Sequence, residues 1–281
     1  MNKKAKCIRV IEYIILTILT ILSVFPFLWM IIAATNQSVD VTKGRLLPGT
    51  YFFENVKHLL ESDLNYMVAF KNSLLIAVIT TTLAMLVSSS AGYAIEIYRS
   101  KAKDFIFNVI LLSMMVPFAA LMVPLFRLFT NFKNTPILKI IALDSEGSVI
   151  IISIATAFLI FFFRQNTRTF PRELVEAARI DGLSEFHIFT KIYMPTMKST
   201  YAAAIVVTFM SSWNNYLWPL IALQSENKRT LPLVISAMGS SYTPDYGMMM
   251  TAVVIATIPT ALLFFLMQKQ FVAGMTGSVK G

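Results

Sequence analysis

Residues 171–195, PRELVEAARIDGLSEFHIFTKIYMP, decide how this chain is organised, because they are polar although long apolar runs lie on both sides of them. Pro171 suits the first position of a helix, where a missing N–H costs nothing. Gly182 suits the left-handed residue that ends a helix, and Ser184 suits the cap of the next one. The sequence therefore predicts two short helices with a sharp turn between them, presented on a membrane surface.

Each predicted helix has a face whose residues recur at steps of three and four. The first face consists of Leu174, Ala177, Ala178 and Asp181. The second face is an apolar stripe of Phe186, Phe189, Ile192 and Tyr193, which stops before Pro195. A proline disfavours helix at the residue before it, so the stripe ends where a helix is expected to end.

The composition is that of a membrane protein. The 281 residues are 56% hydrophobic and 14% charged, with a mean hydropathy of +0.67. Soluble domains carry about a quarter charged residues, so most of this chain faces lipid or protein. The single cysteine, Cys7, cannot form an internal disulfide, and His58 and His187 are too far apart for metal-ligand spacing. We expect no metal site.

Six apolar runs are predicted to cross the membrane: residues 10–34, 69–95, 105–129, 149–163, 199–223 and 247–267. The first run, about 36 Å long as a helix, exceeds the apolar core of a secretory signal. Residues 52–60, in the first loop, favour a short helix at the membrane surface. Pro117 and Pro124 predict kinks in the third span, which serve either as a flexible gate or as packed bends.

The distribution of positive charge orients the spans. Most of the 24 Lys and Arg residues lie on the side of the two chain ends, which six spans place together. By the positive-inside rule, both termini and residues 171–195 are predicted to be cytoplasmic. The formal charge of +9 is then mostly a topology signal, and no basic groove with stacked aromatic residues indicates nucleic acid.

The spacing inside residues 171–195 is specific: Glu176-Ala177-Ala178, then Gly182, then Ile192 and Pro195. This pattern resembles the EAA loop of ABC importer permeases, the binding-protein-dependent transport inner-membrane components. In that family the loop is a coupling helix that docks into a groove of the ATPase subunit. The resemblance implies that role for these residues and for Asp181. Met194 stands where the family usually has leucine, a residue of similar volume. The alternative is a helical cytoplasmic loop without a partner.

Further motifs resemble the carbohydrate branch of the family: Asn72-Ser73, Trp213-Asn214 and the ending from Gln270. Within that branch, the chain is similar over its full length to the smaller permease of maltose-type importers. The resemblance implies the type I ABC importer permease fold, an all-α bundle of six transmembrane helices with a cytoplasmic coupling helix. It also implies a single permease domain over residues 1–281.

The same resemblance implies an assembly in a bacterial cell membrane. Its other members are a second homologous permease, two ABC ATPase subunits that hold ATP and Mg, and an extracytoplasmic solute-binding protein. Residues 224–246 are expected to face the binding protein. The C-terminal tail, residues 268–281, is expected to reach the ATPases through Gln268, Gln270 and Gly274.

The chain itself lacks a nucleotide-binding motif of the form G-x-x-x-x-G-K-[ST], so the ATPase must be another polypeptide. No catalytic set of Ser/His/Asp or Cys/His is evident, and we expect no catalytic residue and no bound cofactor. A self-sufficient secondary transporter is the rival hypothesis. It would need acids within the membrane, whereas Glu12, Glu96 and Asp104 lie near predicted span ends.

Aromatic and amide side chains gather in the fifth predicted span, at Trp213, Asn214, Asn215, Tyr216 and Trp218. Sugars are bound by such a combination of stacking surfaces and hydrogen-bonding groups, so these residues are candidates for the substrate path. The alternative is that the tryptophans pack against neighbouring helices or mark the membrane interface, and that the asparagines join helices. The runs Met114-Met115 and Met248–Met250 are expected to fill the core.

Overall fold

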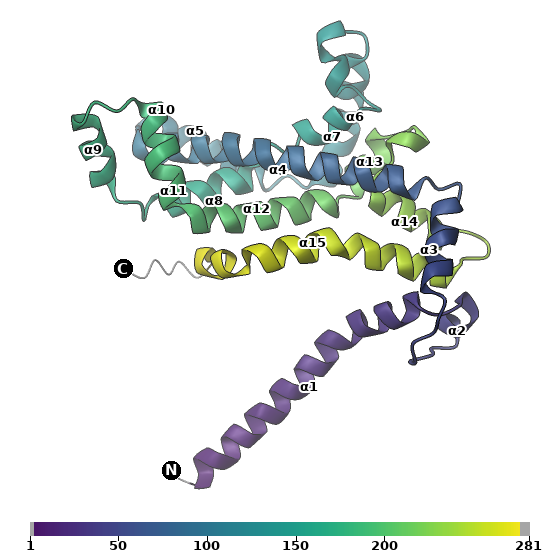
Figure 1. Cartoon of the computed structure of the whole chain (residues 1–281). Helices are drawn as coiled ribbons and strands as arrows, with labels where there is room; N and C mark the ends of the chain where they lie inside the picture. The colour runs from purple at the N-terminus through teal and green to yellow at the C-terminus, as the bar shows by residue number, and fades with distance from the viewer. Residues whose placement is uncertain (1–2, 276–281) are drawn as a thin grey trace. The chain divides into compact units, whose positions relative to one another are not determined.

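The structure, a computed structural model, describes residues 3–275, in which helices are the only regular element. The helices of the first part are α1 (Lys3–Ala34), α2 (Ser38–Thr42), α3 (Phe52–Glu61), α4 (Tyr66–Ile97), α5 (Lys101–Ser113), α6 (Phe118–Phe132), the 3₁₀ helix η1 (Pro136–Ile141), α7 (Glu146–Ile151) and α8 (Ala157–Thr167). The remaining helices are α9 (Arg172–Ile180), α10 (Glu185–His187), the π-helix η2 (Ile188–Tyr193), α11 (Met194–Thr196), α12 (Lys198–Trp213), α13 (Leu217–Ala222), the 3₁₀ helix η3 (Glu226–Lys228), α14 (Leu231–Gly239) and α15 (Tyr246–Met275) (Figure 1).

Three of the described helices are long and apolar enough to cross a membrane, over Ile11–Ala34, Tyr66–Ile97 and Tyr246–Phe271. They coincide with the first, second and sixth predicted spans. The pair α5 and α6 passes the same test together, although its two helices are bent by 101°. If this pair is one span, the described part of the chain has four candidates.

The span predicted over residues 105–129, with kinks at its prolines, is divided into the two helices α5 and α6. The chain leaves the helix after Ser113 and resumes at Phe118, with Pro117 in an extended conformation at the N-cap of α6. A proline restrains the preceding residue to extended backbone and lacks the N–H that a helix interior needs. Pro124 lies inside α6 without ending it. The sharp break therefore belongs to the first of the two prolines.

The predicted spans over residues 149–163 and 199–223 are also interrupted. Between α7 and α8 the chain turns through residues 152–156, and the Thr156 hydroxyl accepts a hydrogen bond from the Leu159 N–H, 3.4 Å away. Between α12 and α13 it leaves the helix at residues 214–216. Cap formation by a short polar side chain competes with an unbroken helix, and it starts α8 at that point.

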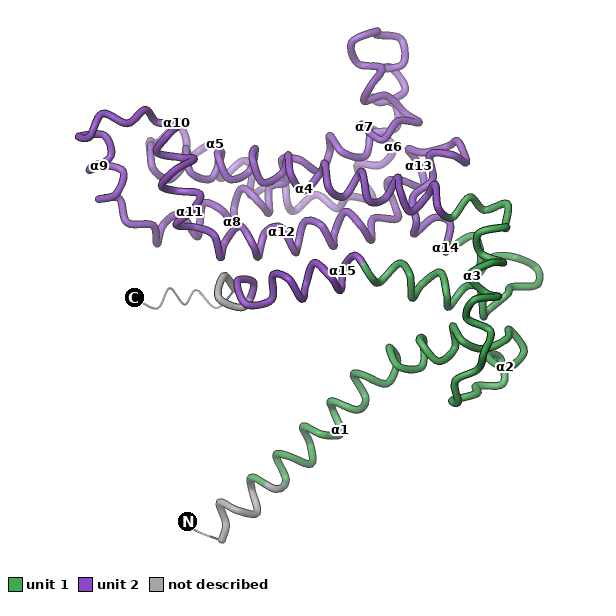
Figure 2. Tube along the Cα trace, viewed as in Figure 1, with its two compact units in different colours: residues 1–66, 235–258 green, residues 67–234, 259–281 purple. Residues whose placement is uncertain are grey.

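Contacts divide the chain into two compact units, residues 1–66 with 235–258 and residues 67–234 with 259–281 (Figure 2). In the first unit, side chains satisfy the last carbonyls of α1. Asn55 donates to the Ala34 and Asn36 carbonyls at 2.9 and 3.0 Å, and Thr251 donates to the Ala34 carbonyl at 3.1 Å. The end of a helix leaves such groups without partners, so α3 and α15 complete the end of α1.

The largest core of the second unit joins α4, α8 and α12 to residues 171–195. This core includes Tyr93, Phe163, Phe170, Tyr193 and Tyr201. Gly92 lets α4 approach α8 closely, because a Cβ at that position would lie 2.7 Å from the Phe163 Cβ atom. The predicted helix over residues 52–60 is confirmed as α3, in the first unit.

Candidate functional site

Residues 171–195 form the two short helical segments that the sequence predicted. Helix α9 begins after Pro171 and ends before Gly182, whose φ of +79° is left-handed. The Gly182 N–H donates to the Arg179 carbonyl, and the Leu183 N–H donates to the Ala178 carbonyl, each at 3.0 Å. This pattern closes the helix and turns the chain sharply. Ser184 stands at the N-cap of α10, although its hydroxyl contacts the His187 Nδ1 atom, 2.8 Å away, and caps no N–H.

The predicted face of α9 is divided between the core and the surface. Val175 and Ala178 are buried against the core of the second unit, whereas Leu174, Ala177 and Asp181 are exposed. Glu176 is exposed as well. The buried stripe of α9 shares only Ala178 with the predicted face, because Val175 also joins the core of tyrosine and phenylalanine side chains.

The second segment also divides differently from its predicted stripe. Phe189 and Tyr193 stack with their ring centroids 5.5 Å apart, and Ile192 is half-buried beside the same core. Phe186 instead points away, with 73% of its surface exposed. Pro195, at the start of α11, is exposed.

Four apolar side chains of this segment are exposed, and we call them the loop patch: Leu174, Ala177, Ile180 and Phe186. Ile180 is 87% exposed and Leu174 is 41% exposed. Scattered apolar residues on a surface are common, but this group lies on a short polar segment outside the predicted spans. An apolar patch with a polar rim is typical of a protein–protein interface.

An ion pair joins the two sides of the turn, and a hydrogen bond attaches the turn to Tyr98, the residue that follows α4. The Arg179 Nε atom lies 2.8 Å from a Glu185 carboxylate oxygen, and the Tyr98 hydroxyl donates to the other oxygen. These hydrogen bonds, that of Arg179 first, lower the pKa of the Glu185 carboxyl below its usual range. The two helical segments are thus joined across Gly182 through one carboxylate.

The start of the loop is attached through Glu96, which the sequence interpretation placed near a span end without giving it a partner. Its side chain is 4% exposed, and each of its two carboxylate oxygens lies 3.2 Å from a guanidinium nitrogen, one of Arg164 and the other of Arg172. Arg168 is 3.7 Å away. Arg164, also 4% exposed, contacts Asp104 at 2.5 Å. These residues, called the charge cluster below, connect α4, α5, α8 and the first residue of α9.

The charge cluster bears on the rival hypothesis of ion-coupled transport. Such a transporter needs an acid that is free to exchange an ion within the membrane. The buried carboxylate of Glu96 is instead paired with guanidinium groups, and the Arg164 guanidinium lies 3.9 Å from the centre of the Phe107 ring. Residues 3–275 contain no group of three or more His, Cys, Asp or Glu side chains able to hold a metal ion.

The candidate substrate-path residues separate into a buried pair and a group that lines a recess. Trp213 and Trp218 are buried: the Trp213 ring stacks on Phe209, and the Trp218 Nε1–H donates to the Ser148 carbonyl at 3.0 Å. Their aromatic faces therefore serve packing. Asn214, Asn215 and Tyr216 lie at the break between α12 and α13, and all three line a recess.

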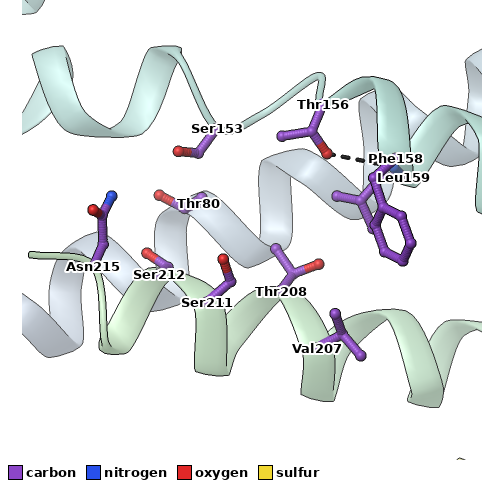
Figure 3. A pocket seen from close by; sticks show the side chains of 10 residues that line it. All are labelled: Thr80, Ser153, Thr156, Phe158, Leu159, Val207, Thr208, Ser211, Ser212 and Asn215. Carbon is purple, nitrogen blue, oxygen red and sulfur yellow. Dashed lines mark hydrogen bonds between the residues drawn. The ribbon is translucent and has the colours of Figure 1, made fainter. Parts of the chain in front are cut away.

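This recess, of about 440 Å³, adjoins a smaller cavity of about 100 Å³. Hydroxyl groups are the commonest polar groups in the lining of the smaller cavity, which α4, α8, α12 and the break before α8 surround (Figure 3). They belong to Thr80, Ser153, Thr156, Thr208, Ser211 and Ser212. The sequence interpretation missed all six. Single Ser and Thr residues in apolar runs are ordinary, and only the folded arrangement brings these together.

The Asn72-Ser73 pair connects α4 to the segment before α14. Asn72 donates to the Asn227 and Arg229 carbonyls at 2.9 and 3.1 Å, and Ser73 accepts from the Leu231 N–H at 2.7 Å.

In the predicted tail, Gln268, Gln270 and Gly274 lie within α15, and residues 276–281 lie outside the described part of the chain. The tail contact with an ATPase stays a prediction.

Comparison with known proteins gives consistent matches. The family described as "Binding-protein-dependent transport system inner membrane component" matches residues 97–277. The lactose transport system permease protein LacG of Rhizobium radiobacter is 47% identical, over 96% of both chains. The arabinooligosaccharides transport system permease protein AraQ of Bacillus subtilis is 35% identical, over 94% of this chain and 92% of its own.

A further relative is the sn-glycerol-3-phosphate transport system permease protein UgpE of Salmonella typhimurium, 32% identical over 91% of this chain and 92% of its own. Among solved structures, a chain of a bacterial ABC transporter involved in the import of the acidic polysaccharide alginate superposes with a TM-score of 0.81. It is 21% identical, and the match covers 96% of this chain and 99% of that one. This likeness shows a shared fold.

Proposed function

Because the chain belongs to the family of binding-protein-dependent transport system inner membrane components, we propose that it is the permease subunit of an ATP-driven importer for a carbohydrate. Relatives named for lactose and arabinooligosaccharide transport support the sugar class. The chain is a transport subunit, and the hydrolysis of ATP belongs to partner chains that hold the ATP and Mg. The absence of a P-loop motif from its sequence supports this division.

The proposed assembly has a second homologous permease, two ATPase subunits and an extracytoplasmic solute-binding protein. The family description supports the last partner, as does a structural relative solved with an alginate pentasaccharide-bound periplasmic protein, at a TM-score of 0.64 and 16% identity. The proposed topology has six spans, with both termini and the loop in the cytoplasm. The charge distribution supports this orientation.

The observation that carries the coupling role is the loop patch. One side of α9 is fixed to the core through Val175 and Ala178, while Leu174, Ala177 and Ile180 on its other side are left for a partner. We assign that partner as the groove of an ATPase subunit. Closure of the ATPase dimer then moves a helix that is attached at both ends, through the charge cluster and through Glu185. Energy enters only through contacts that differ between the two states of the assembly.

A pull-down of the tagged chain from solubilised membranes of its host tests the assembly. We expect recovery of an ATPase and of a second permease. Ile180→Asp should reduce ATPase recovery about tenfold or more, because a charge at the centre of an apolar interface is strongly unfavourable. Ile137→Asp is the matched control, since Ile137 is 86% exposed but lies in η1, outside the loop. Equal losses for the two variants would contradict the docking role, and recovery of the chain alone would contradict the assembly.

A further inference from the structure

The breaks in the helices of the second unit surround the hydroxyl-lined cavity. Residues 152–156, between α7 and α8, contribute Ser153 and Thr156, and the end of α12 contributes Ser211. Ser153, Thr156, Ser211 and Asn215 line both this cavity and the wider recess, so the two spaces adjoin. Figure 3 shows the hydroxyls of Ser153 and Thr80 between α4 and the opposite break. A broken helix is a common way to place polar groups in the interior of a transporter.

Two of the lining hydroxyls have no partner within the described chain. The Oγ1 atoms of Thr80 and Thr208 are buried, and neither has a hydrogen-bond partner. The two residues are 1% and 6% exposed. Many hydroxyls in this chain bond back to their own helix, as Thr82 does to the Val78 carbonyl at 2.8 Å. Those of Thr80 and Thr208 do not, and a buried hydroxyl without a partner is unfavourable unless water or a ligand supplies one.

The lining carries no charge. Neither the cavity nor the recess has a Lys, Arg, His, Asp or Glu among the described residues that line it. Hydroxyl and amide groups donate and accept hydrogen bonds, as the hydroxyls of a sugar do. Phe158, Leu159 and Val207 add an apolar wall that suits the C–H face of a sugar ring. An anion would lose its hydration here without gaining a cation, so the site disfavours it.

We propose that the recess and cavity form a binding subsite for an uncharged sugar ring on this permease subunit. The ring occupies the recess, whose volume lies within the range of small-molecule sites, about 300–1,000 Å³. Its hydroxyls enter the smaller cavity and bind Thr80 and Thr208. This inference rests on the proposed function and deepens it: neutral sugars are accepted, whereas phosphate esters and uronates are excluded at this step of the path.

Protection from thiol labelling tests the subsite directly. Cys7 is the only cysteine, so Cys7→Ser gives a background in which Ser211→Cys introduces one reactive thiol at the recess. Ser211 is exposed and is therefore accessible to a maleimide. The assembled transporter is labelled in the presence of lactose or of other neutral di- and trisaccharides, and separately with glucose 6-phosphate and galacturonate. We expect at least one neutral sugar to slow labelling, and neither anion to do so.

Threonine-to-valine variants identify the hydroxyls. Thr80→Val and Thr208→Val keep the side-chain shape and should each raise the half-protecting sugar concentration about three- to tenfold, the effect of one lost hydrogen bond. Thr82→Val is the matched control, because the Thr82 side chain is exposed and bonds its own helix. It should leave protection unchanged.

Each other outcome overturns the inference. If no neutral sugar protects the thiol, the cavity holds only water; if the anions protect equally, the assigned sugar class is wrong. Co-purification of the ATPase and its hydrolysis of ATP are measured on the same samples. An intact assembly without protection refutes the subsite alone, whereas absence of the ATPase refutes the proposed function.

Discussion

Replacing Glu96 with glutamine removes the carboxylate charge that the arginines of the charge cluster share. Glutamine nearly keeps the shape of the side chain and can still accept a hydrogen bond. The buried guanidinium of Arg164 keeps its contact with Asp104 and with the Phe107 ring. Arg168 and Arg172 are 47% and 54% exposed, so they turn toward solvent at little cost. The perturbation is therefore concentrated on the contact between Glu96 and Arg164.

The size of the effect follows from burial. Breaking a buried ion pair by removing one partner costs about 3–5 kcal/mol. Because glutamine retains an acceptor and Arg164 retains Asp104, we expect a loss of about 2–3 kcal/mol in the free energy of unfolding. Arg172→Gln removes a half-exposed partner and should cost about 1 kcal/mol or less. It should nevertheless weaken the stimulation of ATP hydrolysis by the substrate, because it detaches the start of α9.

Denaturant unfolding of the purified chain in detergent measures the first quantity, and ATP hydrolysis by the reconstituted assembly measures the second. Glu61→Gln is the control, since Glu61 is an exposed acid at the end of α3. It should change the free energy of unfolding by about 0.5 kcal/mol or less. The reasoning fails if Glu96→Gln changes the free energy of unfolding as little as Glu61→Gln does. It also fails if Arg172→Gln lowers that free energy as much as Glu96→Gln does.

Three further predictions concern the loop and its support. Gly182→Val should strain the left-handed turn by about 1–2 kcal/mol and uncouple transport from ATP hydrolysis. The control is Gly44→Val, at a φ of +71° and with equally open surroundings, which should strain the chain without uncoupling transport. Equal transport defects in the two variants would refute the role of the turn. Gly92→Ala should lower the free energy of unfolding, measured with denaturant, by about 1–3 kcal/mol, because the alanine Cβ would lie 2.7 Å from a side-chain carbon of α8. This loss is expected although alanine favours helices. A gain in stability would contradict the close approach of the two helices. The lowered pKa of Glu185 means that its contacts are complete above the ordinary carboxyl range and are lost as the pH falls through the lowered value. The difference in unfolding midpoint between wild type and Glu185→Gln should therefore be constant from about pH 6 to about pH 8 and shrink below about pH 4. A difference that changes near neutral pH would show that the Glu185 carboxylate is not its source.

The loop was predictable because its signals are local. Pro171 and Gly182 restrict their own backbone, and the periodicity between them is read along the chain. The face that packs inward was not predictable in the same way, because Val175 and Ala178 join a core that includes Tyr93 of α4, far from them in the sequence. Local rules give the period of a helix, and tertiary contacts choose its orientation.

The breaks in the third to fifth spans illustrate a second limit. Hydropathy averages over a window, so the short turns at residues 152–156 and 214–216 disappear within apolar runs. Their markers were present: Pro117 begins a helix, and Thr156 caps one. Glu96 was missed for a related reason, because an acid near a span end normally reaches water, and only the folded arrangement shows its arginine partners.

The charge cluster also has a consequence for biosynthesis. Arg164 follows Glu96 by 68 residues, so a ribosome that adds about 5–20 residues per second delivers the arginine roughly 3–14 s after the glutamate. During that interval α4 has emerged with a carboxylate that its own helix cannot neutralise. Glu96 meets its buried partner only once α8 has been made, so a chain that stops before α8 leaves this carboxylate without Arg164.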